Sequence, residues 1–439
     1  MINYLPPREE IYRDMMFRLF PEKVKLDMDV KEITFQVTQD CCVKCTYCYQ
    51  LPKTPNKLSF ETAKKTIDDL LSDKYETLNR NTCFGIVVDF IGGEPFMEIE
   101  LIQQICDYLF SEMIRLDHPW LFYTRLSICS NGILYHDKRV QHFLDLYGNL
   151  CFFSVSIDGN KELHDSCRID HEGKGSYDRA IDAVRSYYKT FKVMPGTKMT
   201  LSPYNIQHTY AAVRNLMDLG YQHINLNCVY ENGWTEEHAN ILYYQLKQLA
   251  DYLIDNELYN VMDISMFEEV NFKPMPEESN ENWCGGVEDF TISIDYKGDI
   301  FRCIRYMESS LNGSQKPLII GNVNRGIGVT EEDKSCLAET TNITRRSQST
   351  DECFYCPIAQ GCGWCSAYNY QETGSVNKRV TYICVMHKAS SLGNAYFWNR
   401  VYRHVGLKKR FKMYLPEEEI LKIISQEEYQ LLKTIEMEE

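Results

Sequence analysis

The chain has 439 residues, enough for two or three domains at roughly 150 residues per domain. Hydrophobic residues make up 44% of it and charged residues 25%, a balance that excludes a disordered or fibrous protein. The 47 basic and 62 acidic residues give a formal charge of −15, which argues against a broad electrostatic grip on nucleic acid or an anionic membrane. The N-terminal residues mix charged with apolar side chains, and no apolar run reaches the roughly 18 residues of a membrane span, so we expect a cytoplasmic protein without a secretory signal.

Six β-rich apolar runs recur between residues 32 and 230. Each is followed by apolar positions at three- and four-residue intervals, which are typical of amphipathic helices. The runs cover residues 33–38, 85–91, 126–129, 152–157, 198–201 and 224–229. Strands that alternate with helices predict an α/β fold with a parallel sheet and right-handed crossovers. Six such units can form either an open, partial barrel or a doubly wound sheet.

The pattern changes past residue 275 to short runs with turn signals and dense cysteine, and no helix is predicted before about residue 385. This pattern predicts a separate small domain whose apolar core is too small to be stable without crosslinks such as bound metal. We expect an N-terminal extension (1–32), the α/β unit (33–232), a bridging helical region (233–275), the cysteine-rich domain (276–404) and C-terminal helices (405–439).

The 18 cysteines are the unusual feature of the composition. Without export they lie in a reducing compartment, where disulfides are uncommon and clustered thiols more often bind metals or act in catalysis. Cys106, Cys129, Cys151 and Cys228 lie in apolar strand or helix runs, and we expect them to be core thiols. Most of the others fall into two groups.

The first group, Cys41, Cys45 and Cys48, follows the first predicted strand in C-x3-C-x2-C spacing. Barrel folds place their chemistry on loops at the carboxyl ends of strands. Three thiolates on one short loop can hold three irons of a cubane and leave the fourth iron open. Zinc is the alternative metal, but a structural zinc site needs a fourth ligand, which only Cys42 supplies locally.

Further motifs stand at the ends of the next predicted strands. The second strand ends in Gly92-Gly93-Glu94-Pro95. Glycines let backbone approach a ligand closely, and a carboxylate accepts hydrogen bonds from an ammonium group. The third strand ends in Ser130-Asn131-Gly132, and the fourth in Ser156-Ile157-Asp158-Gly159, with Arg168 beyond it. Each motif alone is ordinary turn chemistry, whereas their order at successive strand ends is not.

In this order, the cysteine loop and the three motifs resemble the radical S-adenosylmethionine (SAM) superfamily, whose fold is a partial (β/α)6 TIM-like barrel. The resemblance implies that the three cysteines bind a [4Fe-4S] cluster, that its open iron chelates SAM, and that the motifs bind the rest of SAM. Tyr47 and Leu201 would lie near adenine, although both patterns also fit core residues. The residues implied to bind SAM are Tyr47, Gly92, Gly93, Glu94, Ser130, Asn131, Ser156, Asp158, Arg168 and Leu201.

The second group of cysteines resembles the SPASM extension of radical SAM enzymes, which carries auxiliary iron–sulfur clusters. The resemblance implies three [4Fe-4S] clusters in all, one that binds SAM and two auxiliary ones. A pair of zinc knuckles is the alternative, because C-x2-C occurs twice. The implied ligands are Cys353, Cys356, Cys362 and Cys384 for the outer cluster, and Cys284, Cys303 and Cys365 for the inner one.

Two positions depart from the family pattern. The spacing from Cys362 to Cys365 is one residue shorter than the usual C-x3-C. The residues after Cys284 hold no further cysteine, so the inner cluster lacks its usual fourth ligand. Either Cys336 closes this cluster, or an open iron binds a substrate thiolate.

The resemblance implies a peptide maturase, in which reductive cleavage of SAM gives a 5′-deoxyadenosyl radical that abstracts hydrogen from a ribosomally made peptide. A thioether or another carbon-centred crosslink is the expected product. An anaerobic sulfatase-maturase-like protein oxidase is one alternative, but those enzymes have an aspartate directly after the second SPASM cysteine, where Ile304 follows Cys303 here. A non-catalytic iron–sulfur electron carrier or scaffold is the other alternative, and it needs neither the motif at 92–94 nor that at 156–168.

The expected partners are the precursor peptide and a reductant such as flavodoxin or ferredoxin. About 33 residues precede the first predicted strand, too few for the winged-helix-like leader-binding domain of many peptide maturases. We therefore expect the leader to be recognised by a separate protein, by the C-terminal helices or by barrel loops, with no role for nucleic acid or membrane.

Overall fold

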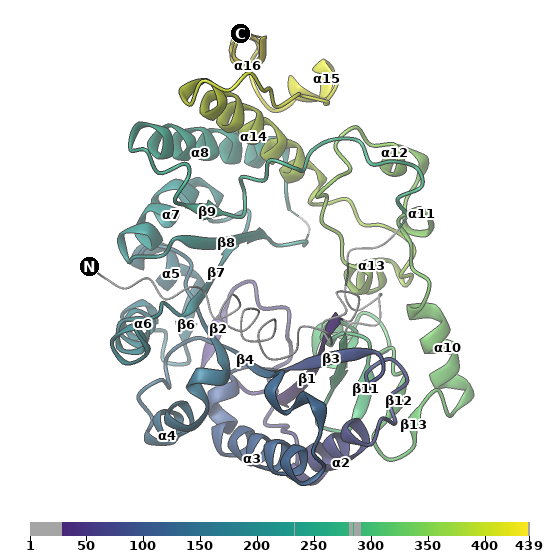
Figure 1. Cartoon of the computed structure of the whole chain (residues 1–439). Helices are drawn as coiled ribbons and strands as arrows, with labels where there is room; N and C mark the ends of the chain where they lie inside the picture. Colours follow the sequence, from purple (N-terminus) through teal and green to yellow (C-terminus); the bar gives the residue numbers. More distant parts are fainter. Residues whose placement is uncertain (1–28, 232, 281–283, 285–290, 438–439) are drawn as a thin grey trace.

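The computed structural model describes residues 29–231, 233–280, 284 and 291–437, and Figure 1 shows their arrangement. The predicted N-terminal extension lies almost wholly outside the described residues. The strands are β1 (Asp29–Thr38), β2 (Val43–Cys45), β3 (Cys83–Gly92), β4 (Thr124–Ser130), β5 (Cys151–Ser156), β6 (Arg168–Asp170), β7 (Gly196–Leu201), β8 (His223–Cys228), β9 (Asp263–Ile264), β10 (Thr291–Ile294), β11 (Asp299–Phe301), β12 (Gly321–Asn322) and β13 (Gly326–Ile327). The α-helices are α2 (Phe60–Leu71), α3 (Ile99–Arg115), α4 (Lys138–Tyr147), α5 (Lys161–Cys167), α6 (Tyr177–Phe191), α7 (Thr209–Asp218), α8 (Glu236–Asp255), α9 (Glu308–Leu311), α10 (Glu331–Thr340), α11 (Arg345–Gln348), α12 (Asp351–Phe354), α13 (Ser366–Thr373), α14 (Cys384–His404), α15 (Glu417–Ile420) and α16 (Gln426–Met437).

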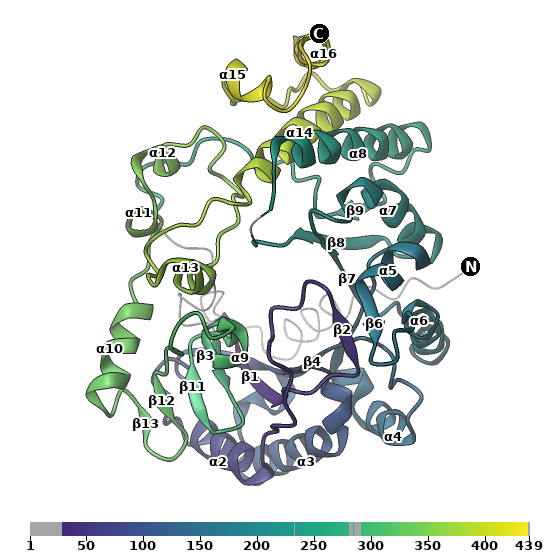
Figure 2. The ribbon, with the colours of Figure 1, turned by 180° about the vertical axis from the view of Figure 1, so that it is seen from behind.

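A single large sheet organises the molecule, in the order β13-β12-β11-β10-β1-β3-β4-β5-β7-β8-β9. The run from β10 to β9 is parallel, and β11 to β13 continue it as antiparallel strands. All six predicted strands are present, and they stand side by side in chain order. This sequential order is that of a barrel wall, so the structure confirms the partial barrel over the doubly wound sheet. Figures 1 and 2 show the wall curving round an interior, with the helices that connect its strands on the outside.

Alternation along the strands decides which side chains face the helices. On β1, Ile33, Phe35 and Val37 are fully buried in the layer between sheet and helices, and Phe35 stacks on Phe90 of β3 with ring centroids 6.1 Å apart. The residues between them are polar and point to the opposite face, which lines the barrel interior. The part of the interior wall that β1 forms is therefore polar.

The cysteine-rich region is joined to the barrel through the sheet. β10 pairs in parallel with β1, so hydrogen bonding continues across the predicted boundary near residue 276. Beyond β10, a small apolar core of its own surrounds Tyr306, Leu311 and Leu318. The cysteine-rich region therefore has a thin core and one strand that is anchored in the barrel wall.

The expectation that the region between residues 275 and 385 contains no helix was wrong. Five short helices, α9 to α13, lie between residues 308 and 373. The longest, α10, has the sequence EEDKSCLAET, whose few apolar residues give no helical periodicity. Its start is fixed by a capping box instead, since Thr330 Oγ1 accepts a hydrogen bond from the backbone N–H of Asp333 and the Asp333 carboxylate accepts one from the N–H of Thr330.

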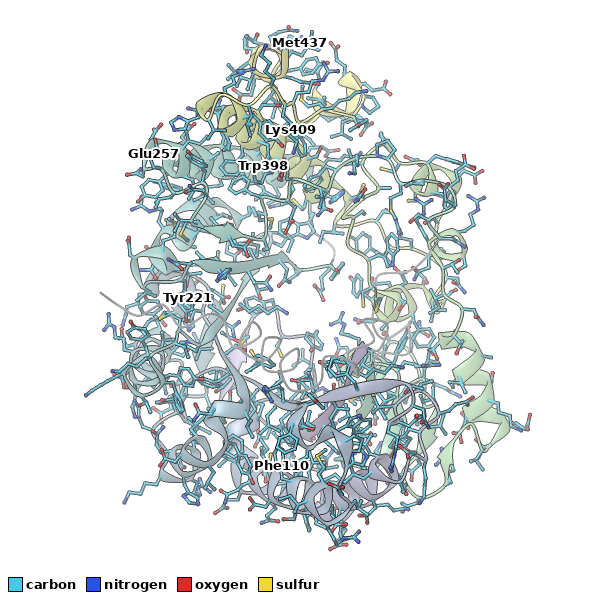
Figure 3. All side chains as sticks on the ribbon, viewed as in Figure 1. Phe110, Tyr221, Glu257, Trp398, Lys409 and Met437 are labelled. Carbon is cyan, nitrogen blue, oxygen red and sulfur yellow. The ribbon has the colours of Figure 1, made fainter. Side chains whose placement is uncertain are left out.

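Three helices, α14 to α16, lie at one end of the barrel (Figure 1). Of these, α15 and α16 fall in the predicted C-terminal range, whereas α14 falls in the range predicted for the cysteine-rich domain. α14 packs along α8 so closely that a Cβ at Gly393 would lie 2.8 Å from the Leu246 side chain. Trp398 of α14 lies in this region, as Figure 3 shows. The Glu428 carboxylate of α16 is 2.5 Å from Lys247 Nζ of α8. In the described part of the chain, no helix is long and apolar enough to cross a membrane.

Candidate cluster and SAM site

The first cysteine loop is held against the barrel by a short ribbon. β2 pairs antiparallel with β6, and Cys45 stands directly opposite Arg168 in this pairing. The backbone N–H of Thr46 also donates to the carbonyl of Cys167, at 3.0 Å. The ribbon therefore couples the loop after β1 to the loop after β5, although its three-residue strands carry no periodic signal that sequence reasoning can detect.

Nitrogen donors approach the sulfur atoms of this loop. Arg168 Nη1 lies 3.7 Å from Cys45 Sγ, while Asn131 Nδ2 lies 3.9 Å from Cys41 Sγ and 3.2 Å from Cys42 Sγ. Burial raises the pKa of Cys45 to about 11, and the Arg168 charge acts in the opposite direction. Such thiols need a metal to stay ionised, and the surrounding N–H groups suit anionic sulfur. The donor set thus fits an iron–sulfur cluster, and the structure adds Cys42, which the spacing had left out, to its surroundings.

The GGEP segment requires glycine because two strand ends meet there. The backbone N–H of Gly93 donates to the Thr38 carbonyl at 3.1 Å, and that of Glu94 to the Asp40 carbonyl at 2.9 Å. A Cβ at Gly93 would lie 2.0 Å from the Asp40 carbonyl oxygen. Only a residue without a side chain permits this contact. It fixes Glu94 beside the cysteine loop.

Glu94 is the centre of a buried hydrogen-bond network. Its side chain is only 1% exposed and accepts hydrogen bonds from Ser130 Oγ at 2.8 Å, the Asn131 N–H at 2.8 Å and the Phe96 N–H at 3.1 Å. Burial raises the pKa of Glu94, and these three donors lower it. A carboxylate has about four lone-pair positions, so one remains for a further donor. The structure therefore brings Glu94, Ser130 and Asn131 together as the motifs predicted.

A second buried network joins the loop after β5 to the cysteine loop. Asp158, fully buried, accepts hydrogen bonds from Arg168 Nε at 2.7 Å, from the Tyr47 hydroxyl and from the Thr200 N–H at 3.1 Å. The Arg168 guanidinium carbon lies 5.4 Å from the centre of the Tyr47 ring. Asp158 thus orients two residues of the predicted site.

Behind this network stands a histidine to which the sequence assigned no role. The Asp158 N–H donates to His164 Nδ1 at 3.3 Å, and Nε2 lies 2.9 Å from Ser176 Oγ, which donates to the Arg168 carbonyl. Burial lowers the pKa of His164 to about 4, so the ring is neutral and its proton lies on Nε2. His164 therefore positions the Asp158 and Arg168 backbone.

Three positions singled out in the sequence, Ser156, Cys129 and Leu201, lie in surroundings other than these two networks. Ser156 lies on the interior wall, where its hydroxyl is 3.5 Å from Cys129 Sγ. Cys129 is exposed, so its expectation as a core thiol was wrong; it alternates with Ile128, which takes the core face of β4. The other expected core thiols, Cys106, Cys151 and Cys228, are buried. Leu201 is fully buried among core residues, and its contact with adenine stays a prediction.

The predicted outer ligands lie together. Burial raises the pKa of Cys362 to about 12, and the charges that act on this thiol are Arg379, which lowers the pKa, and the thiols of Cys384, Cys356 and Cys353. Arg379 stacks on Trp364, with its guanidinium carbon 3.7 Å from the ring centre. Its Nε and Nη2 are buried and have no hydrogen-bond partner among the described residues. Unpaired buried donors beside four cysteines fit an anionic cluster.

The predicted inner ligands also lie together. Burial raises the pKa of Cys303 to about 12, and the thiols of Cys365 and Cys284 act on it as well. Cys365 Sγ accepts a hydrogen bond from the Tyr368 N–H at the start of α13, at 3.4 Å. Cys336 lies on α10, and after burial the charges that raise its pKa are carboxylates of the same helix, Glu339 first. Its place as fourth ligand stays a prediction.

Within the described residues, no three His, Cys, Asp or Glu side chains are grouped so as to hold a single metal ion. A cubane distributes its thiolates over separate irons, and so it does not need such a grouping. The individual ligand assignments remain predictions.

Known proteins resemble the chain in sequence. A family described as a 4Fe-4S single cluster domain matches residues 32–181. An uncharacterized protein of Methanocaldococcus jannaschii, MJ0907, is 26% identical over 200 residues, which are 45% of this chain and 62% of that protein. A cysteine-type anaerobic sulfatase-maturating enzyme of Clostridium novyi is 25% identical over 152 residues, 34% of this chain and 37% of the enzyme. The matched regions thus span less than two thirds of each relative.

Solved structures share the fold over most of the chain. A structure of anSMEcpe with bound AdoMet and a Cp18Cys peptide has a TM-score of 0.60 at 16% identity, covering 85% of this chain and 98% of that one. Streptococcus suis SuiB bound to its precursor peptide SuiA has a TM-score of 0.52 at 14% identity, covering 86% and 80%. The matched cluster domain and the shared fold together confirm the predicted resemblance to radical SAM proteins that carry a SPASM extension.

Proposed function

We propose that the chain is a radical SAM peptide maturase that installs a thioether or another carbon-centred crosslink in a ribosomally made peptide. The observation that carries the proposal is the pair of buried networks beside the first cysteine loop. Glu94 with Ser130 and Asn131 forms one, and Asp158 with Arg168 forms the other. An electron carrier or scaffold has no use for either, because its clusters need only thiolates and a dry surrounding.

The cofactors supply the difficult chemistry: when bound, the first cluster and SAM would provide a 5′-deoxyadenosyl radical. Cys41, Cys45 and Cys48 would hold that cluster. Glu94 has one lone-pair position left for the SAM ammonium group. Ser130 and Asn131 hold the Glu94 carboxylate in place. SAM and the peptide, once bound, would fill the open interior of the barrel and exclude water from it, which protects a radical from side reactions.

The second cysteine region supports an oxidative step. Two auxiliary clusters would accept the electron that remains after hydrogen abstraction and bond formation. SuiB, a protein of the same fold, is bound to a precursor peptide in its solved structure. We propose the same class of partner here, together with a reductant such as flavodoxin or ferredoxin and a separate leader-binding protein.

A sulfatase-maturase-like protein oxidase is the second candidate, favoured by the likeness to the Clostridium novyi enzyme and to anSMEcpe. The residue after Cys303 distinguishes the two candidates. Ile304 begins a short 3-10 helix there and has no proton-accepting group. We therefore prefer the crosslinking reaction.

The test is anaerobic reconstitution with iron and sulfide, followed by dithionite and SAM. We expect 5′-deoxyadenosine, measured by liquid chromatography, and we expect replacement of Cys41, Cys45 and Cys48 by alanine to abolish it while roughly eight irons per chain remain. Cys106→Ala, a core thiol of α3, is the control and should keep cleavage. A fully iron-loaded wild-type protein that makes no 5′-deoxyadenosine would refute the proposal.

A further inference from the structure

An arginine lies between the two cysteine regions, beside the Cys365 and Cys303 thiols of the predicted inner cluster. Arg305 stands two residues after Cys303, in a one-turn 3-10 helix (Ile304–Tyr306). Its guanidinium carbon lies 4.3 Å from the ring centre of Tyr49, the residue directly after Cys48. The same carbon lies 5.7 Å from the ring centre of Tyr368, three residues after Cys365. Segments that are distant in the sequence thus meet at one cation.

We define the Tyr–Arg cluster as Tyr49, Tyr230, Arg305 and Tyr368. Its side chains are closely packed. The Tyr230 and Tyr368 rings are 6.3 Å apart. Gly363, between two cysteines of the second region, makes room for it, since a Cβ there would lie 3.0 Å from the Tyr230 hydroxyl. Two aromatic rings beside one guanidinium fix its plane. Its edge N–H groups then remain to meet a ligand.

Burial lowers the pKa of Arg305, and the nearby Cys365, Tyr49, Glu231 and Cys303 raise it, but among the described residues no carboxylate lies within hydrogen-bond distance of its guanidinium. Its side chain is 14% exposed, and the ion pair that the structure gives it is with Glu231 at 3.8 Å. That distance exceeds a hydrogen bond, and the Glu231 side chain is 42% exposed. A cation withdrawn from water needs a hydrogen-bonded anion to offset its lost hydration. Glu231 is too loosely placed to serve fully.

We propose that Arg305 binds a carboxylate of the substrate peptide in a bidentate manner, and that the Tyr–Arg cluster thereby selects acidic peptides. The carboxylate comes either from an aspartate or glutamate side chain or from the peptide C-terminus. A planar guanidinium fork matches both carboxylates equally well. This inference rests on the proposed function, because it names the substrate class of the same site. Glu231 is the internal anion that the peptide carboxylate displaces.

The test measures binding of three short peptides to the reconstituted full chain by calorimetry. The first has one aspartate and an amidated C-terminus, the second has asparagine and a free C-terminus, and the third has asparagine and an amidated C-terminus. We expect at least one of the first two to bind roughly tenfold more tightly than the third, as hydrogen bonds to a charged group allow. Which of them binds identifies the source of the carboxylate.

Variants assign the effect to this residue. Arg305→Gln should remove the preference for the carboxylate peptide without changing affinity for the neutral one. Arg305→Lys should keep part of it, because lysine retains the charge but not the fork. Glu231→Gln should increase the preference by removing the internal competitor. Arg139→Gln, which alters an exposed ion pair with Asp137 on the outer helix α4, should leave it unchanged.

Three outcomes would overturn the inference: equal affinity of wild type for all three peptides, no binding of either carboxylate peptide at up to about 10 mM, or an unchanged preference in Arg305→Gln. If that variant only shifts the midpoint potential of an auxiliary cluster, Arg305 serves the cluster and not the peptide. SAM cleavage is measured in the same preparations. Peptide preference without cleavage would contradict the proposed function alone, and cleavage without preference would contradict this inference alone.

Discussion

The two cysteine regions are built in opposite ways. The first lies on one loop of the barrel wall, where the backbone contacts of Gly93 and Glu94 and the ribbon of β2 with β6 hold it. The second collects cysteines from residue 284 to residue 384 around a small core. There, within the part of the chain that the structure describes, two buried N–H donors of Arg379 have no hydrogen-bond partner. The comparison teaches that the protein holds the first site in shape, whereas the second depends on what it binds.

Removal of iron should separate the two regions most clearly. Chelation of the reconstituted protein should expose the backbone of residues 296–384 to rapid hydrogen exchange, because a thin core gains its stability from the clusters. The central strands β1, β3 and β4 should stay protected. Hydrogen-exchange mass spectrometry with and without chelator checks this. Equal protection of both regions after chelation would break the comparison.

Within the first region, the buried Asp158–Arg168 pair should be the most costly to break. Both residues of this pair are buried. Asp158→Asn removes the negative charge and leaves the Arg168 charge without its ion-pair partner. We expect a loss of about 3–5 kcal/mol in the free energy of unfolding, measured by urea denaturation. Asp351→Asn breaks an exposed pair with Arg346 and should cost less than about 1 kcal/mol. Similar losses in both variants would mean that the network does not stabilise the site.

The pH dependence of stability should report His164. Because burial lowers its pKa from 6.5 to about 4, the folded state binds fewer protons than the unfolded state between these pH values. The free energy of unfolding should therefore rise with pH across this window and fall on acidification, by up to roughly 3 kcal/mol from this residue. His164→Gln should reduce this slope in denaturation at several pH values, and the buried His387, whose pKa burial also lowers to about 4, should keep the remainder. His142→Gln, at an exposed position, should leave the slope unchanged. A wild-type slope retained in the first variant would assign the effect elsewhere.

The smallest expected effect concerns the cation of the second region. Arg379→Gln should lower the midpoint potential of the outer cluster, because a nearby positive charge favours the reduced, more negative form. Redox titration followed by electron paramagnetic resonance measures this. Arg410→Gln, at an exposed site outside the cysteine-rich region, is the matched control. An unchanged potential would mean that the unpaired donors of Arg379 face something other than the cluster.

The sequence predicted the parts of the fold whose signal is local. Each of the six wall strands has a long apolar run and an amphipathic helix after it, so all six are found. The same holds for Glu94, Ser130 and Asn131, because strand ends of a parallel sheet meet at one edge. Order along the chain was enough to bring them together.

The rest depends on contacts between segments that are distant in the sequence. β2, β6 and β10 are only three or four residues long and are defined by their partners. Exposure of Cys129 depends on the open interior of the barrel, which apolar neighbours in the sequence cannot indicate. Cys42 does not fit the cysteine spacing of the loop, so its position near the candidate cluster site is evident only from its contact with Asn131. The proposed role of Arg305 likewise depends on its contacts with Tyr49 and Tyr368, which are distant in the sequence.

The pairing of β10 with β1 has a mechanical consequence. β1 runs directly into the first cysteine loop, and β10 leads through β11 to Cys303, so a continuous ladder of hydrogen bonds joins the roots of both regions. A hinge between them would have to break that ladder. Electron transfer slows steeply as the distance between redox centres increases. If both regions hold clusters as proposed, the sheet would keep the distance between those clusters the same in every turnover. Adaptation to different proposed peptide substrates would then depend on loops and side chains.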